Sequence, residues 1–211
     1  MNPWLNGALV YGGLALVTLA PALVKLVRGV PLHPGGAGFA ESVPFSDSAK
    51  QRLSQHYSRM QGTLSFWKKQ AEIYRYLHYY CLCWTIPSSV IIPFLAQAIT
   101  SDPWSKWMIT LVSAYTAILL TFHRALKVDA NYRSFRQGES EFYDLYRRML
   151  DRPKTFGADE DEQLEKYFDA IENLRKYVRN AEIDNLPTLE QVKAQLEQEQ
   201  SRRVPRAGRG S

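Results

Sequence analysis

Residues 79–122 read YYCLCWTIPSSVIIPFLAQAITSDPWSKWMITLVSAYTAILLTF. This stretch contains two apolar segments, 79–101 and 104–122, and a membrane-spanning helix needs roughly 20 mostly apolar residues. Only Asp102 and Pro103 separate the two segments, and so short a link makes consecutive helices antiparallel neighbours. The sequence therefore predicts a tight transmembrane hairpin.

A third apolar segment, residues 5–24, precedes the hairpin and carries no charged side chain. A signal peptide has basic residues before its apolar core, whereas Lys25 and Arg28 follow this one. We therefore expect residues 1–28 to form a retained N-terminal transmembrane helix.

Basic residues flank the three apolar segments at one end only, and cytoplasmic flanks carry an excess of Lys and Arg. The hairpin turn offers Lys106 alone, whereas the other flanks hold Lys25, Arg28, Lys68, Lys69, Arg75, Arg124, Lys127, Arg133 and Arg136. This pattern places the N-terminus and the turn outside, and residues 25–78 and 123–211 in the cytoplasm. The net charge of +5 then reflects topology and contact with the lipid bilayer, and we expect no nucleic-acid partner.

Heptad patterns extend both hairpin helices beyond the apolar segments. Before the first segment, the steps alternate four and three through Leu53, Tyr57, Met60, Leu64, Trp67, Ala71, Tyr74 and His78. After the second, they continue through Val128, Tyr132, Phe135, Glu139, Phe142, Tyr146 and Met149. Because two such stripes can bury each other, we predict one helical unit over residues 46–152, with a stiff cytoplasmic stalk.

Three further segments complete the predicted organisation. Residues 29–45 are rich in Gly and Pro, which is typical of a flexible linker. Residues 153–200 are expected to form cytoplasmic C-terminal helices, one starting at Asp159 and a short one capped by Thr188. The small, basic tail 201–211 is predicted to be disordered. The apolar positions of the helix from Asp159 are Leu164, Tyr167, Ile171, Leu174, Val178 and Ala181.

The expected fold class is thus an all-α membrane protein. A transmembrane helical hairpin extends into a cytoplasmic helical stalk, and one N-terminal transmembrane helix is added to it. The chain contains no phosphate-binding loop, dinucleotide fingerprint, zinc-protease or hydrolase motif, so we expect neither an enzyme nor a cofactor. Cys81 and Cys83 point to nearly opposite faces of a helix, so they do not form a metal-binding pair.

Polar residues inside the paired spans have two possible roles. Hydroxyl and amide groups line pores in oligomers, but they also bond neighbouring helices within a membrane. Packing is the favoured interpretation, because an isolated monomer with two or three spans has no pore to line. The candidate pore or packing residues are Thr85, Ser89, Gln97, Ser113 and Thr116.

Two histidines, His78 and His123, lie at the cytoplasmic ends of the paired spans. Antiparallel helices bring these ends together, so the two rings are predicted to face one another. A histidine pair at this place serves either as an interfacial anchor or as a pH-sensitive or ligand-binding pair, and anchoring is favoured.

Three motifs around the hairpin carry a family resemblance. They are FWKKQAEIYRYLHYY before the first span, SVIIPFL within it, and ANYRSFRQGESEFYDLYRRML after the second. Through them, residues 46–150 resemble the SLATT family of bacterial two-span membrane proteins. The resemblance implies a self-associating, multi-pass protein of the cell inner membrane that acts as a pore-forming or membrane-perturbing effector in a bacterial conflict system. The added N-terminal span is a departure from the family.

An alternative function is a non-catalytic membrane adaptor. Its C-terminal helices, over residues 159–200, would dock a cytoplasmic protein partner. Short helices are marginal on their own, so these must pack on the stalk or on another protein. A homo-oligomer would support the effector, and a complex of fixed ratio with another protein would support the adaptor.

Overall fold

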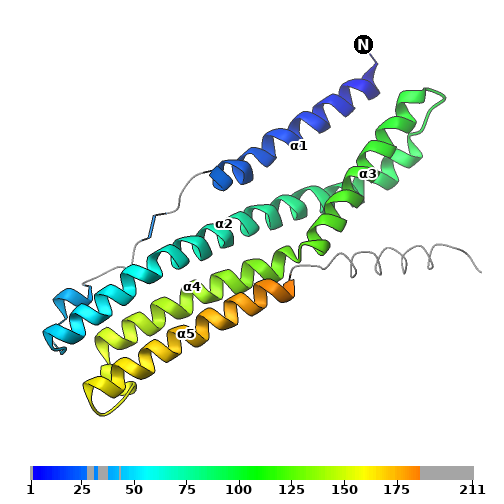
Figure 1. The fold of residues 1–211 in the computed structure, drawn as a ribbon. Coiled ribbons are helices and arrows are strands. Elements are labelled where there is room, and N and C mark those ends of the chain that lie inside the picture. The colour runs from blue at the N-terminus through cyan, green and yellow to red at the C-terminus, as the bar shows by residue number, and fades with distance from the viewer. Residues whose placement is uncertain (1, 28–30, 33–37, 43, 186–211) are drawn as a thin grey trace, which may run out of the picture.

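The computed structural model describes residues 2–27, 31–32, 38–42 and 44–185. Within these residues the chain is all-α, with five α-helices and two short 3-10 helices (Figure 1). In chain order they are α1 (Pro3–Val27), η1 (Phe39–Glu41), α2 (Asp47–Gln97), α3 (Pro103–Ala125), α4 (Val128–Asp151), η2 (Pro153–Thr155) and α5 (Glu160–Asn185).

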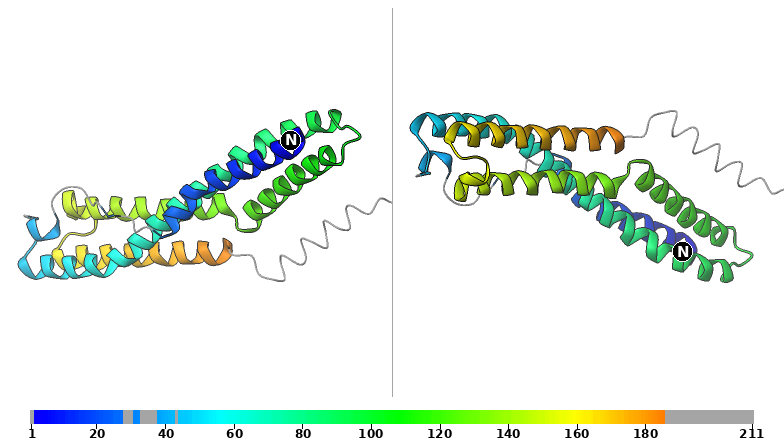
Figure 2. Two further views of the ribbon diagram at one scale, coloured as in Figure 1. Left: turned by 90° about the horizontal axis from the view of Figure 1, so that it is seen from above. Right: turned by 90° about the horizontal axis from the view of Figure 1, so that it is seen from below.

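The helices form two bundles that share α2. The apolar bundle consists of α1, residues 79–97 of α2, and α3; the charged bundle consists of residues 47–78 of α2, with α4 and α5. Figure 2 shows that the two bundles are tilted relative to one another. α1, α2 and α3 are each long and apolar enough to cross a membrane.

α2 is a single helix of 51 residues that belongs to both bundles. Its first turn is capped by Ser46, whose hydroxyl accepts a hydrogen bond from the Ala49 amide at 3.3 Å. At 1.5 Å per residue the helix is about 75 Å long. It continues through Pro87 and Pro93 without a break. The predicted continuity between the first heptad stripe and the first apolar segment of the hairpin is confirmed.

The second half of the hairpin does not continue in the same way. α3 ends at Ala125 and α4 begins at Val128, because Lys127 has a φ angle of 41°, a left-handed conformation that interrupts an α-helix. Asn131 Nδ2 holds the turn by donating to the Leu126 carbonyl at 2.9 Å. The prediction of one stiff helix on this side is therefore wrong, and α4 leaves the direction of α3 (Figure 2).

The core of the charged bundle follows the heptad positions predicted from sequence. Its buried side chains come from three helices, because α5 packs against both α4 and α2. The stalk is thus a three-helix bundle and not a two-helix pair. Its core residues are Leu53, Met60, Leu64, Trp67 and Ala71 of α2, Phe135, Phe142, Tyr146 and Met149 of α4, and Leu164, Tyr167, Ile171, Leu174 and Val178 of α5.

The segment 29–45, expected to be a linker, also contributes to this core. Phe39 and Phe45 are buried in it, and the Phe39 ring centroid lies 4.5 Å from that of Tyr146. The described part of the segment is therefore packed against the charged bundle at these two positions.

Gly138 sets the distance between the helices of the charged bundle. A Cβ atom added there would lie 2.5 Å from Val178 Cγ2 of α5 and 3.4 Å from Trp67 Cε3 of α2. The missing side chain thus allows α4 to approach both neighbours.

α5 begins one residue after the position predicted for its start. The Asp159 carboxylate accepts a hydrogen bond from the Glu162 amide at 2.8 Å, and three acidic residues occupy the first turn, where the helix dipole favours them. Near the other end, Lys127 Nζ donates to the Asp184 carbonyl at 2.6 Å. The helix predicted from Thr188 and the tail 201–211 lie outside the described residues.

Candidate functional site

Hydrogen bonds between polar side chains attach α1 to the hairpin. The hydroxyls of Tyr11 and Ser88 lie 2.9 Å apart, and Trp84 Nε1 donates to Thr18 Oγ1 at 2.9 Å. Between apolar helices such bonds support association where hydrophobic burial does not. α1 is therefore a packed member of the apolar bundle, which its sequence did not indicate.

An aromatic cluster occupies the centre of these contacts. The ring centroids of Tyr11 and Trp84 lie 4.9 Å apart and those of Trp84 and Tyr115 lie 6.0 Å apart, both edge to face. The Tyr80 hydroxyl bonds the Tyr115 hydroxyl and donates to the Ala15 carbonyl. The cluster thus connects α1, α2 and α3.

Polar contacts also fix both ends of the apolar bundle. At one end, Asn2 Nδ2 donates to the Asp102 carboxylate, which also caps α3 by accepting from the Trp104 amide at 3.0 Å. At the other end, Lys25 and Glu72 form an ion pair of 2.8 Å. The N-terminus and the hairpin turn therefore lie at the same end of the bundle (Figure 1).

The five candidate pore or packing residues are separated by the structure. Thr85 and Thr116 are buried, and each hydroxyl bonds the carbonyl four residues earlier in its own helix, at 2.7 and 2.8 Å. Ser113 is half-buried, whereas Ser89 and Gln97 are exposed on the outside of the bundle. They do not converge on one space within a single chain.

The two predicted interfacial histidines do come together. His78 Nδ1 and His123 Nε2 lie 2.9 Å apart, and the ring centroids are 5.1 Å apart. Such a bond needs a hydrogen on one nitrogen and a free lone pair on the other, so it is lost when both rings are fully protonated. The structure thus joins α2 and α3 through this pair, and its role as an anchor or a pH-sensitive pair stays a prediction.

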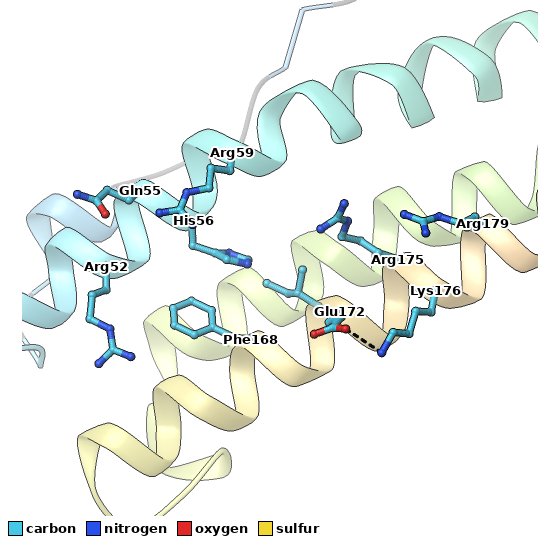
Figure 3. A pocket seen from close by; sticks show the side chains of 10 residues that line it. Arg52, Gln55, His56, Arg59, Phe168, Glu172, Arg175, Lys176 and Arg179 are labelled. Atoms are coloured by element: carbon cyan, nitrogen blue, oxygen red, sulfur yellow. Dashed lines mark ion pairs between the residues drawn. The ribbon is translucent and has the colours of Figure 1, made fainter.

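A cavity in the charged bundle was not indicated by any sequence motif. It lies between α2 and α5 and has a volume of about 470 Å³ (Figure 3). Helical spacing puts Arg52 and Arg59 on one face of α2, and Arg175 and Arg179 on one face of α5. This helical spacing of the arginines was the one sequence feature that could have indicated the cavity. It does not show that the two faces meet, because they come together only when α5 packs on α2.

The cavity is strongly basic. Five basic side chains and a single carboxylate line it: Arg52, Arg59, Arg175, Lys176, Arg179 and Glu172. The Lys176 ammonium lies 2.7 Å from the Glu172 carboxylate, and Arg52 lies 3.5 Å from Asp161 outside the cavity. Within the described part of the chain, Arg59, Arg175 and Arg179 form no ion pair. Most of the positive charge is therefore not neutralised locally.

His56 and Phe168 form an aromatic wall of this cavity. Their ring centroids lie 4.6 Å apart with the planes tilted by 37°. Burial lowers the pKa of His56, and the positive charges of Arg59 and Arg175 lower the pKa further. The imidazole is therefore neutral near pH 7.

The described residues hold no group of three or more His, Cys, Asp or Glu side chains that could bind a metal ion. Cys81 is buried and Cys83 is exposed, as expected for opposite faces of α2. Comparison of the chain with protein-family models, with curated proteins and with solved structures gives no match.

Proposed function

We propose that this chain is an integral membrane protein in which α1, residues 79–101 and α3 span the bilayer. The observation that supports this most strongly is the apolar outer surface of these helices, where Leu16, Phe94 and Ile118 are 72%, 67% and 65% exposed. Soluble monomers rarely expose contiguous apolar patches beyond a few hundred Å². α1 and α3 have 25 and 23 residues, or roughly 35 Å each, which suits a hydrocarbon core of about 30 Å.

The proposed topology has the N-terminus and the hairpin turn outside and the charged bundle in the cytoplasm. Two observations support it. The contact of Asn2 with Asp102 brings the N-terminus and the turn to one end of the apolar bundle. The basic flanks, including Lys25 and Arg124, lie at the other end, as the excess of positive charge on cytoplasmic flanks requires.

We propose further that the hairpin and its cytoplasmic extension form a SLATT-like module. Two of the three motifs behind this resemblance pack against each other. Phe135, in the motif after the hairpin, has its ring centroid 5.8 Å from that of Phe66 and 6.1 Å from that of Tyr74, both in the motif before it. Shared motifs that form one interface support a shared helical arrangement.

Self-association through the outer face of the hairpin is part of this proposal. Gln97 is exposed on helix α2, where a bilayer offers no hydrogen-bonding partner to a side chain. Ser89 is exposed on the same helix, but its hydroxyl already donates to the Ile86 carbonyl at 2.7 Å, so the proposal depends on Gln97. A second copy of the chain can supply a partner to Gln97, because amide and hydroxyl groups bond across neighbouring helices in membranes. We therefore favour a homo-oligomer that acts as a pore-forming or membrane-perturbing effector, without catalytic activity.

The adaptor function ranks second. The adaptor function was suggested because the C-terminal helices need a surface on which to pack. α5 finds that surface within its own chain, where its apolar positions are buried. What still favours a docked protein is the outer surface of α5, where Tyr177 and Ile183 are 50% and 60% exposed.

Native mass spectrometry of the full chain in lipid nanodiscs, together with dye release from liposomes, tests the proposal. We expect a defined homo-oligomer that releases dye. Gln97→Leu should weaken the oligomer, whereas Thr110→Val should not, because the exposed Thr110 hydroxyl already bonds its own backbone at 3.0 Å. A monomer that leaves liposomes intact would refute the effector, and a fixed-ratio complex with another protein from native membranes would favour the adaptor.

A further inference from the structure

We propose that the cavity between α2 and α5 binds a small, soluble anion that carries two or more phosphate groups. Arginines reach this cavity from both helices, Arg59 from α2 and Arg175 and Arg179 from α5 (Figure 3). A guanidinium presents a planar fork of donors that matches phosphate oxygens, so this residue type recognises phosphate better than an isolated ammonium does. The site is independent of the self-association proposed above.

The size and walls of the cavity suit a small ligand. Its volume of about 470 Å³ lies within the range of roughly 300–1,000 Å³ typical of small-molecule sites. Phe168, Ile171 and the neutral ring of His56 give it an apolar side, and the arginines give it a charged rim. The Nδ1 atom of His56 is buried without a hydrogen-bond partner among the described residues. The site therefore offers exposed basic side chains next to an apolar surface.

The arrangement of charge favours several phosphate groups over one. Arg175 and Arg179 are four residues apart on α5, and like charges at this spacing slightly destabilise a helix, an effect that a bound anion would offset. Arg59 lines the same cavity from α2, and the cavity volume of about 470 Å³ is much larger than a single phosphate ion. Glu172 holds Lys176 at 2.7 Å, so Lys176 is partly neutralised and the carboxylate opposes anion binding.

The position of the cavity favours a soluble source of the phosphate over the headgroups of the proposed bilayer. Twenty helical residues separate Arg59 from Tyr79, where the apolar part of α2 begins, and they extend about 30 Å. The polar layer of a bilayer is only about 5–8 Å thick on each side. A headgroup of the same membrane therefore does not reach Arg59. Arg179 lies nearer the bilayer, because Asp184, five residues further along α5, contacts Lys127 just beyond α3. The anion that joins Arg59 to the arginines of α5 is therefore a soluble one.

The test is calorimetric titration of the full chain in nanodiscs of neutral lipid, with tripolyphosphate, pyrophosphate, orthophosphate and sulfate as the probes. We expect saturable binding of tripolyphosphate that is at least about tenfold tighter than that of orthophosphate or sulfate. Combining Arg59→Gln with Arg175→Gln should weaken it by about tenfold or more. Arg133→Gln is the matched control, since Arg133 is exposed on α4, pairs with Asp129 and does not line the cavity.

Glu172→Gln provides a second test of the site, and its result does not depend on whether the arginine variants fold. It removes the one carboxylate of the cavity and releases Lys176, so tripolyphosphate should bind about threefold tighter or more. Unchanged or weaker binding to this variant would overturn the proposal, as would an equal loss in Arg133→Gln or no saturable binding at all. Binding that appears only when phosphoinositide is added to the nanodiscs would overturn the soluble source.

Discussion

The apolar bundle and the charged bundle share α2 but place apolar side chains in opposite directions. In the charged bundle, Leu53 and Leu64 point inward and are fully buried, whereas Ile86 and Phe94 of the same helix point outward and are 60% and 67% exposed. The surroundings of each half of α2, and not helix propensity, therefore decide which face of the helix is covered. One continuous helix fits both bundles, because most of its apolar side chains face the core before about His78 and face outward after it.

The two bundles are also stabilised by different interactions. In the proposed topology water surrounds the charged bundle, so burial of apolar area in its three-helix core is the main stabilising contribution. Between membrane helices that contribution is small, because lipid is as apolar as the side chains. There, hydroxyl bonds and aromatic contacts, such as those of Tyr11, Trp84 and Ser88, do more of the stabilising.

The largest expected difference comes from truncating one large side chain in each bundle. Phe142→Ala removes a ring that is 0% exposed in the charged bundle and should lower the free energy of unfolding by about 3–5 kcal/mol. Ile118→Ala removes a side chain that is 65% exposed in the apolar bundle and should change it by less than about 0.5 kcal/mol. Denaturant unfolding followed by circular dichroism in detergent measures both. Equal losses would contradict the assignment of inner and outer faces.

A pair of glycine substitutions should have opposite signs. Gly138→Ala introduces a Cβ that collides with Val178 and should cost about 1–3 kcal/mol. Gly62→Ala meets nothing within 4 Å on an exposed face of α2, so it should stabilise the helix by about 0.5–1 kcal/mol. Thermal unfolding of the two variants measures the contrast. A neutral Gly138→Ala would mean that α4 and α5 are not in close contact.

Removing one polar contact should have a smaller effect on the apolar bundle. Tyr11→Phe deletes the hydroxyl that bonds Ser88, and membrane hydrogen bonds average about 0.6 kcal/mol. Crosslinking of cysteines placed on α1 and α2 would report the looser docking of α1. Thr18→Val should act similarly, because it removes the hydroxyl that accepts from Trp84. Unchanged crosslinking in both variants would mean that these hydrogen bonds do not attach α1 to the hairpin.

The smallest expected effect concerns pH and the charged bundle. Burial and the neighbouring arginines lower the pKa of His56 in the folded chain, so the unfolded chain takes up the proton first. Stability should therefore be fully present above about pH 6.5 and should fall as the pH decreases from there. His56→Asn should flatten this dependence between pH 7.5 and 5.5. The carboxyl of Glu160, whose pKa is lowered by hydrogen bonds from Ser46, contributes only below that window.

Local patterns were sufficient to predict most of the helices. The heptads fixed the inner faces of α2, α4 and α5, and the pairing of His78 with His123 followed from the short hairpin link. The turn at Lys127 was missed because it contains no Gly or Pro, and its left-handed conformation depends on contacts such as that of Asn131 with the Leu126 carbonyl. Turns of this kind carry no local signal.

The docking of α1 and the basic cavity were missed for a related reason. Each depends on residues far apart in the sequence that come together only after the helices have packed: Tyr11 meets Ser88, and Arg59 and Arg175 line one cavity. Helical periodicity identifies the face on which such residues lie, but it does not identify the opposite helix. The partner of a face is set by three-dimensional packing.

Side-specific labelling tests whether the apolar bundle spans a membrane and the charged bundle lies in water on its inner side. In a chain with Cys81 and Cys83 replaced by alanine, one cysteine is placed at exposed Ser101 in the turn or at exposed Ser58 in the charged bundle. A membrane-impermeant maleimide should label Ser101→Cys only from outside intact cells, and Ser58→Cys only in inverted vesicles. Labelling of both from the same side would contradict the account.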